Sequence, residues 1–380
     1  MMKTTSEEPT EGLGPRVTTA EARAMLRRVI ELNRDSDAPP VAFCLWGAAG
    51  IGKSSLVADV AAELGLDFAL ISPAQIEEMG DLHGIPFATE DARGQQITRN
   101  ASPAFLPTPG PEPGVLLLDD YNRADQRIVA GCMDLVLSGR LLEWNLPAGW
   151  TVVCTANPQQ DAYAVSPLDP AVLTRMCHAT VTFDAASWVR WAARTGLDRR
   201  GIDFVIAYPE VISSSGPLTT PRSFARFLRL LRGIPDLQAE SSTVYRLGLS
   251  CLDAPAVAAF LAFIEDDLPA LLTAEEVLDT DDWSSVAERL RETSESGSRV
   301  DRLTVISSRI VRMLSAPSYR PCPRESERHR ANLMLWFELD FIPLDVNVAL
   351  HGELITTAGP AVRGYLRDPH LAGFLVGALG

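Results

Sequence analysis

The feature that most constrains the fold is the octapeptide GAAGIGKS at residues 47–54. It matches the pattern G-x-x-x-x-G-K-[ST], with Lys53 and Ser54 at the last two positions. The apolar run VAFCLW (residues 41–46) precedes it, and a helical segment is predicted over residues 52–64. A glycine-rich turn between a buried strand and a helix directs backbone N–H groups and the positive end of the helix dipole toward phosphates. The pattern therefore predicts a phosphate-binding loop, called the P-loop below.

Each part of this loop has an expected role in binding Mg-ATP. Lys53 is expected to reach the β and γ phosphates, and the Ser54 hydroxyl is expected to ligate Mg²⁺. ATP is favoured over GTP because the sequence contains no guanine-reading NKxD pattern. The predicted nucleotide-binding residues are Gly47, Ala48, Ala49, Gly50, Ile51, Gly52, Lys53, Ser54, Ser55 and, further along the chain, Asp119.

Two adjacent acids, Asp119 and Asp120, follow the apolar strand candidate at residues 115–118 in VLLLDDYNRAD. This segment resembles a Walker B motif, and ligands bind at the carboxyl ends of strands in open α/β sheets. Asp119 is expected to hold Mg²⁺ through its water shell, and Asp120 stands where a glutamate normally polarises the attacking water. Because aspartate is shorter, and a misplacement of about 1 Å can cost about 100-fold in rate, slow hydrolysis stays open. The simpler interpretation is a pair of solvated turn carboxylates.

Three further polar residues complete a candidate catalytic set. Asn157, in TVVCTANP, follows another apolar strand candidate, where its side chain could orient the water that attacks the γ-phosphate. Arg175 lies in SPLDPAVLTRM, and Arg222 lies in TTPRSFARF directly after a proline that begins a helix. Taken singly, Asn-Pro is typical of a turn and an arginine of a solvated surface. Their order after the P-loop and the paired acids favours catalysis by Asp120, Asn157, Arg175 and Arg222.

Short apolar segments alternate with helical segments over residues 18–184. Because parallel strands need long crossover connections, this alternation predicts a mainly parallel sheet covered by helices on both faces. The expected fold class is α/β, an αβα sandwich of the P-loop NTPase type. Further strands are predicted at residues 68–71, 115–118, 150–155 and 179–183. The first helix is predicted to have a capping box at Thr18 and Glu21 and an apolar face of Ala22, Leu26, Ile30 and Leu32.

The chain divides into four predicted segments. Residues 1–17 are acidic and without periodicity, which is typical of a disordered leader, and residues 18–184 form the nucleotide-binding domain. From residue 185 helical signals dominate, including a capping box at Thr273 and Glu276, and predict a helical lid domain to residue 315. A proline-rich stretch then leads into a C-terminal extension, residues 316–380, which ends in the apolar LAGFLVGALG.

The order of these motifs resembles that of the AAA+ ATPases over residues 18–315. NRAD after the paired acids, with ANP at the asparagine position, resembles the MoxR branch of that superfamily. The resemblance implies that Asn157 is sensor 1, that Arg222 is sensor 2 on the lid, and that Arg175 is an arginine finger. Such a finger reaches the nucleotide site of a neighbouring subunit, so ATP hydrolysis in a ring, typically of six subunits, is implied. A role for Arg123 is left open.

The same resemblance implies a protein client, typically a von Willebrand factor A domain protein that is matured, loaded with metal or assembled. Two segments, ISPAQIEEMGDLHGIP and RLLEWNLPAGWT, resemble loops that contact clients, although ordinary surface hairpins are the alternative. Glycines that would let these loops bend are Gly80, Gly84, Gly139 and Gly149. His83 stands alone in the first loop, so Mg²⁺ is the one metal expected.

Composition restricts the other function classes. Thirty-four Lys and Arg against 49 Asp and Glu give a net charge of −15, which disfavours nonspecific binding to nucleic acid and anionic membranes. A nucleic-acid motor or loader is a lesser alternative, since the basic cluster RESERHR (residues 324–330) is typical of a solvated helix face. Another alternative function is a nucleotide-dependent scaffold or switch in bacterial defence or signalling, with slow hydrolysis because of Asp120. Scattered cysteines and the lack of an export signal or bilayer-length apolar run predict a cytoplasmic protein without membrane insertion.

Overall fold

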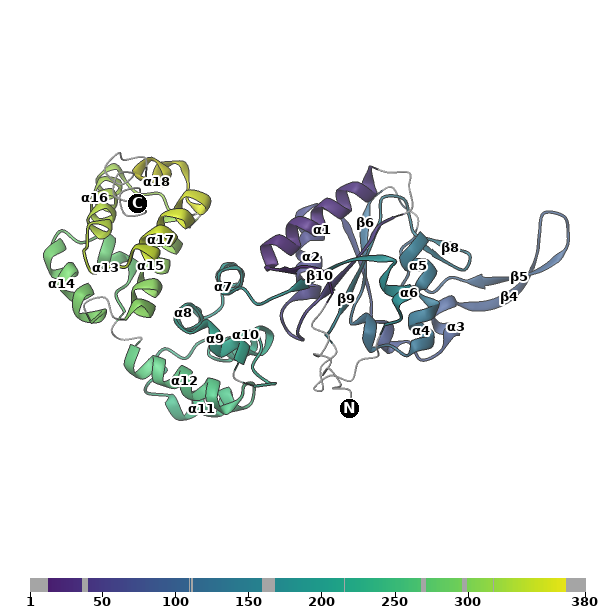
Figure 1. Cartoon of the computed structure of the whole chain (residues 1–380), viewed down its shortest axis with the longest axis horizontal. Coiled ribbons are helices and arrows are strands. Elements are labelled where there is room, and N and C mark those ends of the chain that lie inside the picture. The colour runs from purple at the N-terminus through teal and green to yellow at the C-terminus, as the bar shows by residue number, and fades with distance from the viewer. Residues whose placement is uncertain are drawn as a thin grey trace, which may run out of the picture. The chain divides into compact units, whose positions relative to one another are not determined.

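The computed structural model describes residues 13–35, 40–108, 110, 112–158, 168–214, 216–267, 271–295, 299–316 and 318–366. The chain forms two compact units. One, called the sheet unit, comprises Met1–Trp188 and Thr220–Arg222, and the other, called the helical unit, comprises Val189–Thr219 and Ser223–Gly380. Figure 1 labels most of the helices and several of the strands of the two units.

Six strands of the sheet unit form one parallel sheet in the order β1-β10-β2-β9-β6-β3. Strand β9 pairs with β2 on one side and with β6 on the other, so that Val153 stands between Phe43 and Leu117. Strand β2 leads into the P-loop, and β6 leads into the paired acids. The end of β9 therefore lies between the ends of these two strands. The strands are β1 (Arg16–Val17), β2 (Ala42–Trp46), β3 (Asp67–Ile71), β6 (Gly114–Leu118), β9 (Thr151–Ala156) and β10 (Met176–Val181).

Successive strand residues alternate between two apolar cores, one on each face of the sheet. On one face, Phe43 and Leu45 pack with α1 (Thr19–Arg34) and α2 (Lys53–Glu63). On the other, Cys44 and Trp46 pack with buried residues of α4 (Gln126–Gly131) and α5 (Met133–Ser138). Helices thus cover both faces (Figure 1), and the predicted α/β sandwich with a parallel sheet, followed by a helical region, is confirmed.

Helix α1 begins where its sequence predicts, because Thr18 and Glu21 form a complete capping box. Three residues of the predicted apolar face are buried, but the prediction for Leu32 is wrong, since 45% of its surface is exposed. Asn33 is buried in the last turn instead. Nδ2 of Asn33 donates to the carbonyl of Val41 at 3.0 Å, and the N–H of Val41 donates to Oδ1 of Asn33 at 2.9 Å.

The predicted disordered leader is wrong at its end. Arg16–Val17 form β1, which pairs with Thr180 and Val181 of β10, and the Thr180 hydroxyl donates to the carbonyl of Leu13 at 2.9 Å. Backbone pairing orders this segment although its side chains show no periodicity. Residues 1–12 of the predicted leader lie outside the described residues.

Two antiparallel hairpins accompany the sheet. One joins β4 (Ile85–Glu90) to β5 (Gln96–Ala101), and the other joins β7 (Arg140–Leu141) to β8 (Trp144–Asn145). Figure 1 shows the β4–β5 hairpin extending away from the sheet. Ahead of it lie η1 (Pro73–Gln75) and α3 (Met79–His83), which contains Gly80. At Gly84, between α3 and β4, an added Cβ would lie 1.8 Å from the Ala101 carbonyl oxygen, so the close approach requires glycine.

The described part of the helical unit has an aromatic core. The ring of Phe204 lies 5.6, 5.3 and 5.5 Å from the rings of Phe224, Phe260 and Phe263, in stacked and edge-on arrangements. The predicted capping box begins α13. Helix α6 (Pro170–Leu173) lies between β9 and β10 in the sheet unit. The helices that follow β10 along the chain are α7 (Ala185–Arg194), α8 (Arg199–Ala207), α9 (Pro209–Ser214), α10 (Pro221–Leu230), α11 (Ser241–Leu249), α12 (Ala254–Ala262), η3 (Phe263–Asp267, a π-helix), α13 (Ala274–Leu278), α14 (Trp283–Thr293), α15 (Val300–Leu314), α16 (Pro323–Phe337), α17 (Leu344–Thr357) and α18 (Pro360–Tyr365).

The basic cluster RESERHR lies in α16. Arg328 pairs with Asp279 and Asp281, at 3.4 and 3.2 Å, and His329 is buried with its Nε2 2.7 Å from Asp279. Both side chains are engaged within the helical unit, which favours the structural interpretation of the cluster. The apolar end of the chain, residues 371–380, lies outside the described residues. No helix among the described residues has the length and apolar character to cross a membrane.

Candidate functional site

The P-loop runs from the end of β2 to the start of α2, and its glycines adopt conformations that other residues disfavour. Gly47, Gly50 and Gly52 have φ values of 152°, 78° and 103°. A Cβ on Gly50 would lie 2.6 Å from the hydroxyl oxygen of Thr220, whereas a Cβ built on Gly52 would have no described atom within 4 Å apart from the glycine and its two chain neighbours. The space beside Gly52, at the N-terminus of α2, is thus open to a ligand. Backbone N–H groups and the helix dipole favour an anion there.

Lys53, the first residue of α2, folds back into the loop and is 6% exposed. Its Nζ donates to the carbonyls of Gly47 (2.7 Å) and of the next residue (3.2 Å), and to Oδ1 of Asn157 (3.0 Å). Burial lowers the pKa of Lys53 from 10.5 to about 8, although the charges of Asp120 and Asp119 raise it. Among the described residues, only neutral oxygens accept hydrogen bonds from this ammonium. A bound triphosphate would therefore supply the anionic hydrogen-bond partner that this ammonium lacks among the described residues.

Ser54 and Asp119 meet directly, although 64 residues separate them in sequence. The Ser54 hydroxyl donates to Oδ1 of Asp119 at 2.5 Å, and the hydroxyl of Thr155, on β9, donates to the same oxygen at 2.6 Å. Hydroxyl and carboxylate oxygens are the protein ligands that Mg²⁺ takes, directly or through its waters. The pair of Ser54 and Asp119 therefore fits the predicted metal position in its chemistry.

Asp120 turns the chain out of the sheet. It has φ 52°, in the left-handed region that is uncommon for a residue other than glycine. Its N–H donates to the hydroxyl of Thr155 at 2.9 Å, its Oδ1 accepts from Nδ2 of Asn157 at 2.8 Å, and its Oδ2 lies 3.4 Å from Nε of Arg123. The carboxylate is thus held between an amide and a guanidinium, with 40% of the side chain exposed.

Asn157 lies between the P-loop and the paired acids because β9 lies between β2 and β6. Its Oδ1 accepts from Lys53 and its Nδ2 donates to Asp120, so one buried amide bridges the two motifs. Its backbone is held in turn by the side chain of Asn122, which is 2% exposed. Nδ2 of Asn122 donates to the carbonyl of Asn157 at 2.7 Å, and the N–H of Asn157 donates to Oδ1 of Asn122 at 3.1 Å.

The two arginines of the predicted catalytic set are placed differently. Arg222, near the start of α10, donates its backbone N–H to the carbonyl of Gly50 at 3.1 Å, and its charge lowers the pKa of Lys53. Arg175 follows α6 and donates to the carbonyl of Ala171. Its buried Nε has no partner among the described residues. The structure brings Arg222 to the P-loop but does not bring Arg175 to the Lys53 network of the same chain.

Two residues of this network, Thr155 and Asn122, were not predicted as site residues. Both lie inside quoted motifs, Thr155 in TVVCTANP and Asn122 in NRAD. The available signal was a polar residue close to the carboxyl end of an apolar strand: Thr155 is the last but one residue of β9, and Asn122 lies four residues after β6 ends. The rest of NRAD is accounted for locally: Arg123 pairs with Asp120, and Asp125 caps α4 by accepting from the N–H of Arg127.

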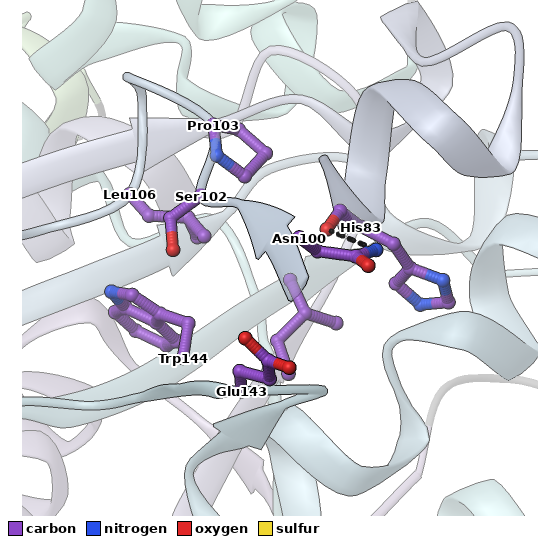
Figure 2. A pocket seen from close by; sticks show the side chains of 8 residues that line it. His83, Asn100, Ser102, Pro103, Leu106, Glu143 and Trp144 are labelled. Atoms are coloured by element: carbon purple, nitrogen blue, oxygen red, sulfur yellow. Dashed lines mark hydrogen bonds between the residues drawn. The ribbon is translucent and has the colours of Figure 1, made fainter. Parts of the chain in front are cut away.

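A separate hollow lies where the two hairpins meet α3. Figure 2 shows it between His83 and Asn100 on one side and Glu143 and Trp144 on another. It encloses no volume that a water molecule could occupy, and Nδ2 of Asn100 donates to the carbonyl, not the ring, of His83. No cluster of three metal-ligating side chains occurs in the part of the chain that the structure describes.

Comparison with known proteins gives distant likenesses. No protein-family model matches this chain, and no curated protein does. Among solved structures, the chain is similar to the Holliday junction branch migration motor RuvB of Thermotoga maritima, with 15% identity and a TM-score of 0.38 over 73% of this chain and 76% of that one. It is also similar to NtrX of Brucella abortus, with 13% identity and a TM-score of 0.37 over 92% and 70% of the two chains, and to the same protein in complex with ADP, with 16% identity and a TM-score of 0.35 over 90% and 69%. Identities and TM-scores this low assign no family and carry no argument about function.

Proposed function

We propose that this chain is an ATPase that binds Mg-ATP at the P-loop and hydrolyses it. One observation carries the proposal: two hydrogen-bonded sets converge at the carboxyl ends of β2, β9 and β6. Lys53, Asn157 and Asp120 form one set, and Ser54 and Asp119 belong to the other. This is the arrangement that cleavage of a phosphate anhydride requires, with cationic and metal-binding groups on one side and a water-activating carboxylate on the other.

The residues have distinct proposed roles. The open space at Gly52 receives the phosphates, and Lys53 exchanges its carbonyl partners for their oxygens. Ser54 and Asp119 hold Mg²⁺, which neutralises charge that develops on the phosphate oxygens. Asp120 orients and accepts a proton from the attacking water, and Asn157 fixes the position of that carboxylate. Arg222, beside Gly50, is proposed to sense the nucleotide from the helical lid, residues 185–315.

We further propose that hydrolysis takes place in a ring and acts on a protein partner. The motif order that resembles MoxR-like AAA+ ATPases supports this, with Arg175 as the finger that completes the site of a neighbouring subunit. A finger of that kind contributes about 10³–10⁵ in rate, so turnover depends on assembly. By the same resemblance the partner is a von Willebrand factor A domain protein, and the β4–β5 and β7–β8 hairpins are candidate contact surfaces.

The experiment measures ATP turnover per chain as protein concentration is raised, for the wild type and for Arg175→Ala. Turnover is expected to rise as rings assemble, and Arg175→Ala is expected to lower it at least about 1000-fold while nucleotide binding is kept. Arg28→Ala is the matched control, because Arg28 is a 77% exposed arginine of α1. A wild-type rate that does not depend on concentration, or equal rates for the two variants, contradicts assembly-dependent hydrolysis.

A second candidate function is a nucleotide-dependent scaffold or switch with slow hydrolysis. The position of Asp120 favours it, since both carboxylate oxygens of this short side chain are engaged by Asn157 and Arg123. Asp120→Glu distinguishes the two candidates. A gain of about tenfold or more in turnover favours the switch, whereas brisk wild-type turnover with no gain removes its basis.

A further inference from the structure

We infer that Asn122 is a positioning residue for ATP turnover, which holds Asn157 in the one orientation that can bridge Lys53 and Asp120. The inference rests on the proposed function and adds a residue to which no role has been assigned. It starts from the two hydrogen bonds between the Asn122 side chain and the backbone of Asn157, of 2.7 and 3.1 Å.

These bonds replace strand pairing at the point where the sheet ends. On the β6 side, the last register pair of β9 joins Cys154 to Leu118, and on the β2 side it joins Ala156 to Trp46. Among the described residues, no strand therefore pairs with Asn157 to take its N–H and C=O. The Asn122 side chain offers one acceptor and one donor, so it occupies both groups as a peptide of an added strand would.

The local chain places Asn122 for this contact. Asp120 reverses the backbone with its positive φ, and Tyr121 then anchors the following 3₁₀ turn (η2, Tyr121–Arg123). The Tyr121 ring is fully buried, and its hydroxyl donates to the carbonyl of Val129 at 3.0 Å. Asn122 is consequently directed back toward the end of β9 from a fixed turn.

The consequence for chemistry follows from the asymmetry of the Asn157 amide. Its Oδ1 must face the ammonium of Lys53 and its Nδ2 must face the carboxylate of Asp120, at 3.0 and 2.8 Å. A shift or rotation of the Asn157 backbone would move both contacts together. Since a displacement of about 1 Å in such a set can cost about 100-fold in rate, releasing Asn157 should lower turnover while the P-loop still binds nucleotide.

The chain contains a matched control for this clamp. Asn33, also buried, pairs with the N–H and C=O of Val41 at 2.9 and 3.0 Å and additionally donates to the Thr151 hydroxyl at 3.0 Å. Val41 precedes β2 and Thr151 begins β9, so this clamp lies at the opposite end of the strands from the P-loop. Substituting Asn33 removes at least as many bonds without touching the site.

The experiment compares four variants of the full chain, Asn122→Asp, Asn122→Ala, Asn33→Asp and Asn33→Ala, with the wild type. Steady-state ATP turnover gives kcat, calorimetry with a magnesium-bound non-hydrolysable ATP analogue gives Kd, and urea unfolding gives the stability of each variant. The Asn122 variants are expected to lose about 10–100-fold in kcat with Kd changed less than about threefold. The Asn33 variants, at similar or lower stability, are expected to keep kcat within about twofold.

The outcomes separate this inference from the proposed function. If the wild type hydrolyses ATP and the Asn122 and Asn33 variants lose kcat equally, or Asn122 variants lose affinity instead of kcat, the positioning role is overturned and the proposed function stands. If the wild type neither binds nor hydrolyses ATP, the proposed function fails and this inference fails with it. The alanine pair keeps the comparison valid should a buried aspartate prevent folding.

Discussion

Proton uptake on nucleotide binding is the most quantitative expectation of the site. Burial lowers the pKa of Lys53 to about 8 in the free protein, because the ammonium has neutral oxygens but no anion as hydrogen-bond partners among the described residues. A triphosphate beside the ammonium should restore the pKa to about its ordinary value or higher. Binding at alkaline pH must therefore bring a proton with it.

The magnitude follows from the two pKa values. With a free pKa of about 8 and a bound pKa near 10.5, binding takes up about 0.1 proton at about pH 7 and about 0.9 at about pH 9. Because the free protein loses its proton as pH rises through 8, affinity falls with rising pH, by about tenfold between these two values. The free energy of unfolding changes with pH in the opposite direction to the affinity. Below about pH 8 the lowered pKa of Lys53 destabilises the folded state, and between about pH 8 and 10.5 the stability rises as the folded protein loses this proton first.

Titration calorimetry with a magnesium-bound non-hydrolysable ATP analogue measures this uptake. At about pH 9 the observed enthalpy is determined in buffers of different ionisation enthalpy, and its slope gives the number of protons. Lys53→Arg is the control, because a guanidinium does not titrate in this range and should abolish the slope. A wild-type slope near zero, together with an affinity that is the same at about pH 7 and about pH 9, would refute the assignment of Lys53 as the buried cation that meets the phosphates.

Three further expectations concern single residues. Gly52→Ala and Gly65→Ala should each destabilise the protein by about 1–2 kcal/mol in urea unfolding, since both glycines have positive φ (103° and 63°) and an added Cβ meets no atom within 4 Å at either. Only Gly52→Ala should also lower the affinity for Mg-ATP, by about tenfold or more, and equal affinities would contradict the placement of the phosphates. Ser54→Ala should reduce the affinity gained from Mg²⁺ about 10-fold, measured by nucleotide titration with magnesium or with a chelator, and an unchanged gain would exclude Ser54 as a ligand. Asp203→Ala should cost about 3–5 kcal/mol in urea unfolding, because it leaves partly buried arginines such as Arg309, now 2.7 Å from the buried Asp203, without a counter-charge. A loss below about 1 kcal/mol would show that solvent compensates their charge.

The sequence predicted those parts of the fold and site that depend on local patterns. The P-loop, the strand before it and the helix after it occupy consecutive residues, so spacing alone locates them, and the capping box at Thr18 marks the start of α1 in the same way. The parallel sheet was predictable because buried strands alternate with helices. Leu32 was misjudged because the last turn of α1 buries the polar Asn33 in its place.

What the sequence could not predict depends on contacts between distant residues. Thr155 and Asn122 act through strand order, which brings β9 between β2 and β6, and nothing in the local pattern specifies that order. The β4–β5 hairpin was missed because its residues face no core, as Ile85, 74% exposed, illustrates, so the alternation that marks a strand is weak. The predicted finger role of Arg175 concerns a neighbouring subunit and stays a prediction.

The central claim is that Mg-ATP lies on the P-loop with its metal at Ser54, and an experimental structure of the complex tests it most directly. The protein would be solved with Mg²⁺ and a non-hydrolysable ATP analogue. The account predicts phosphates in the space beside Gly52, Nζ of Lys53 bonded to phosphate oxygens, and a metal on Ser54 in place of the 2.5 Å bond to Asp119. A nucleotide bound elsewhere, or one bound at the P-loop while Lys53 keeps its carbonyl partners and the bond from Ser54 to Asp119 persists, would contradict it.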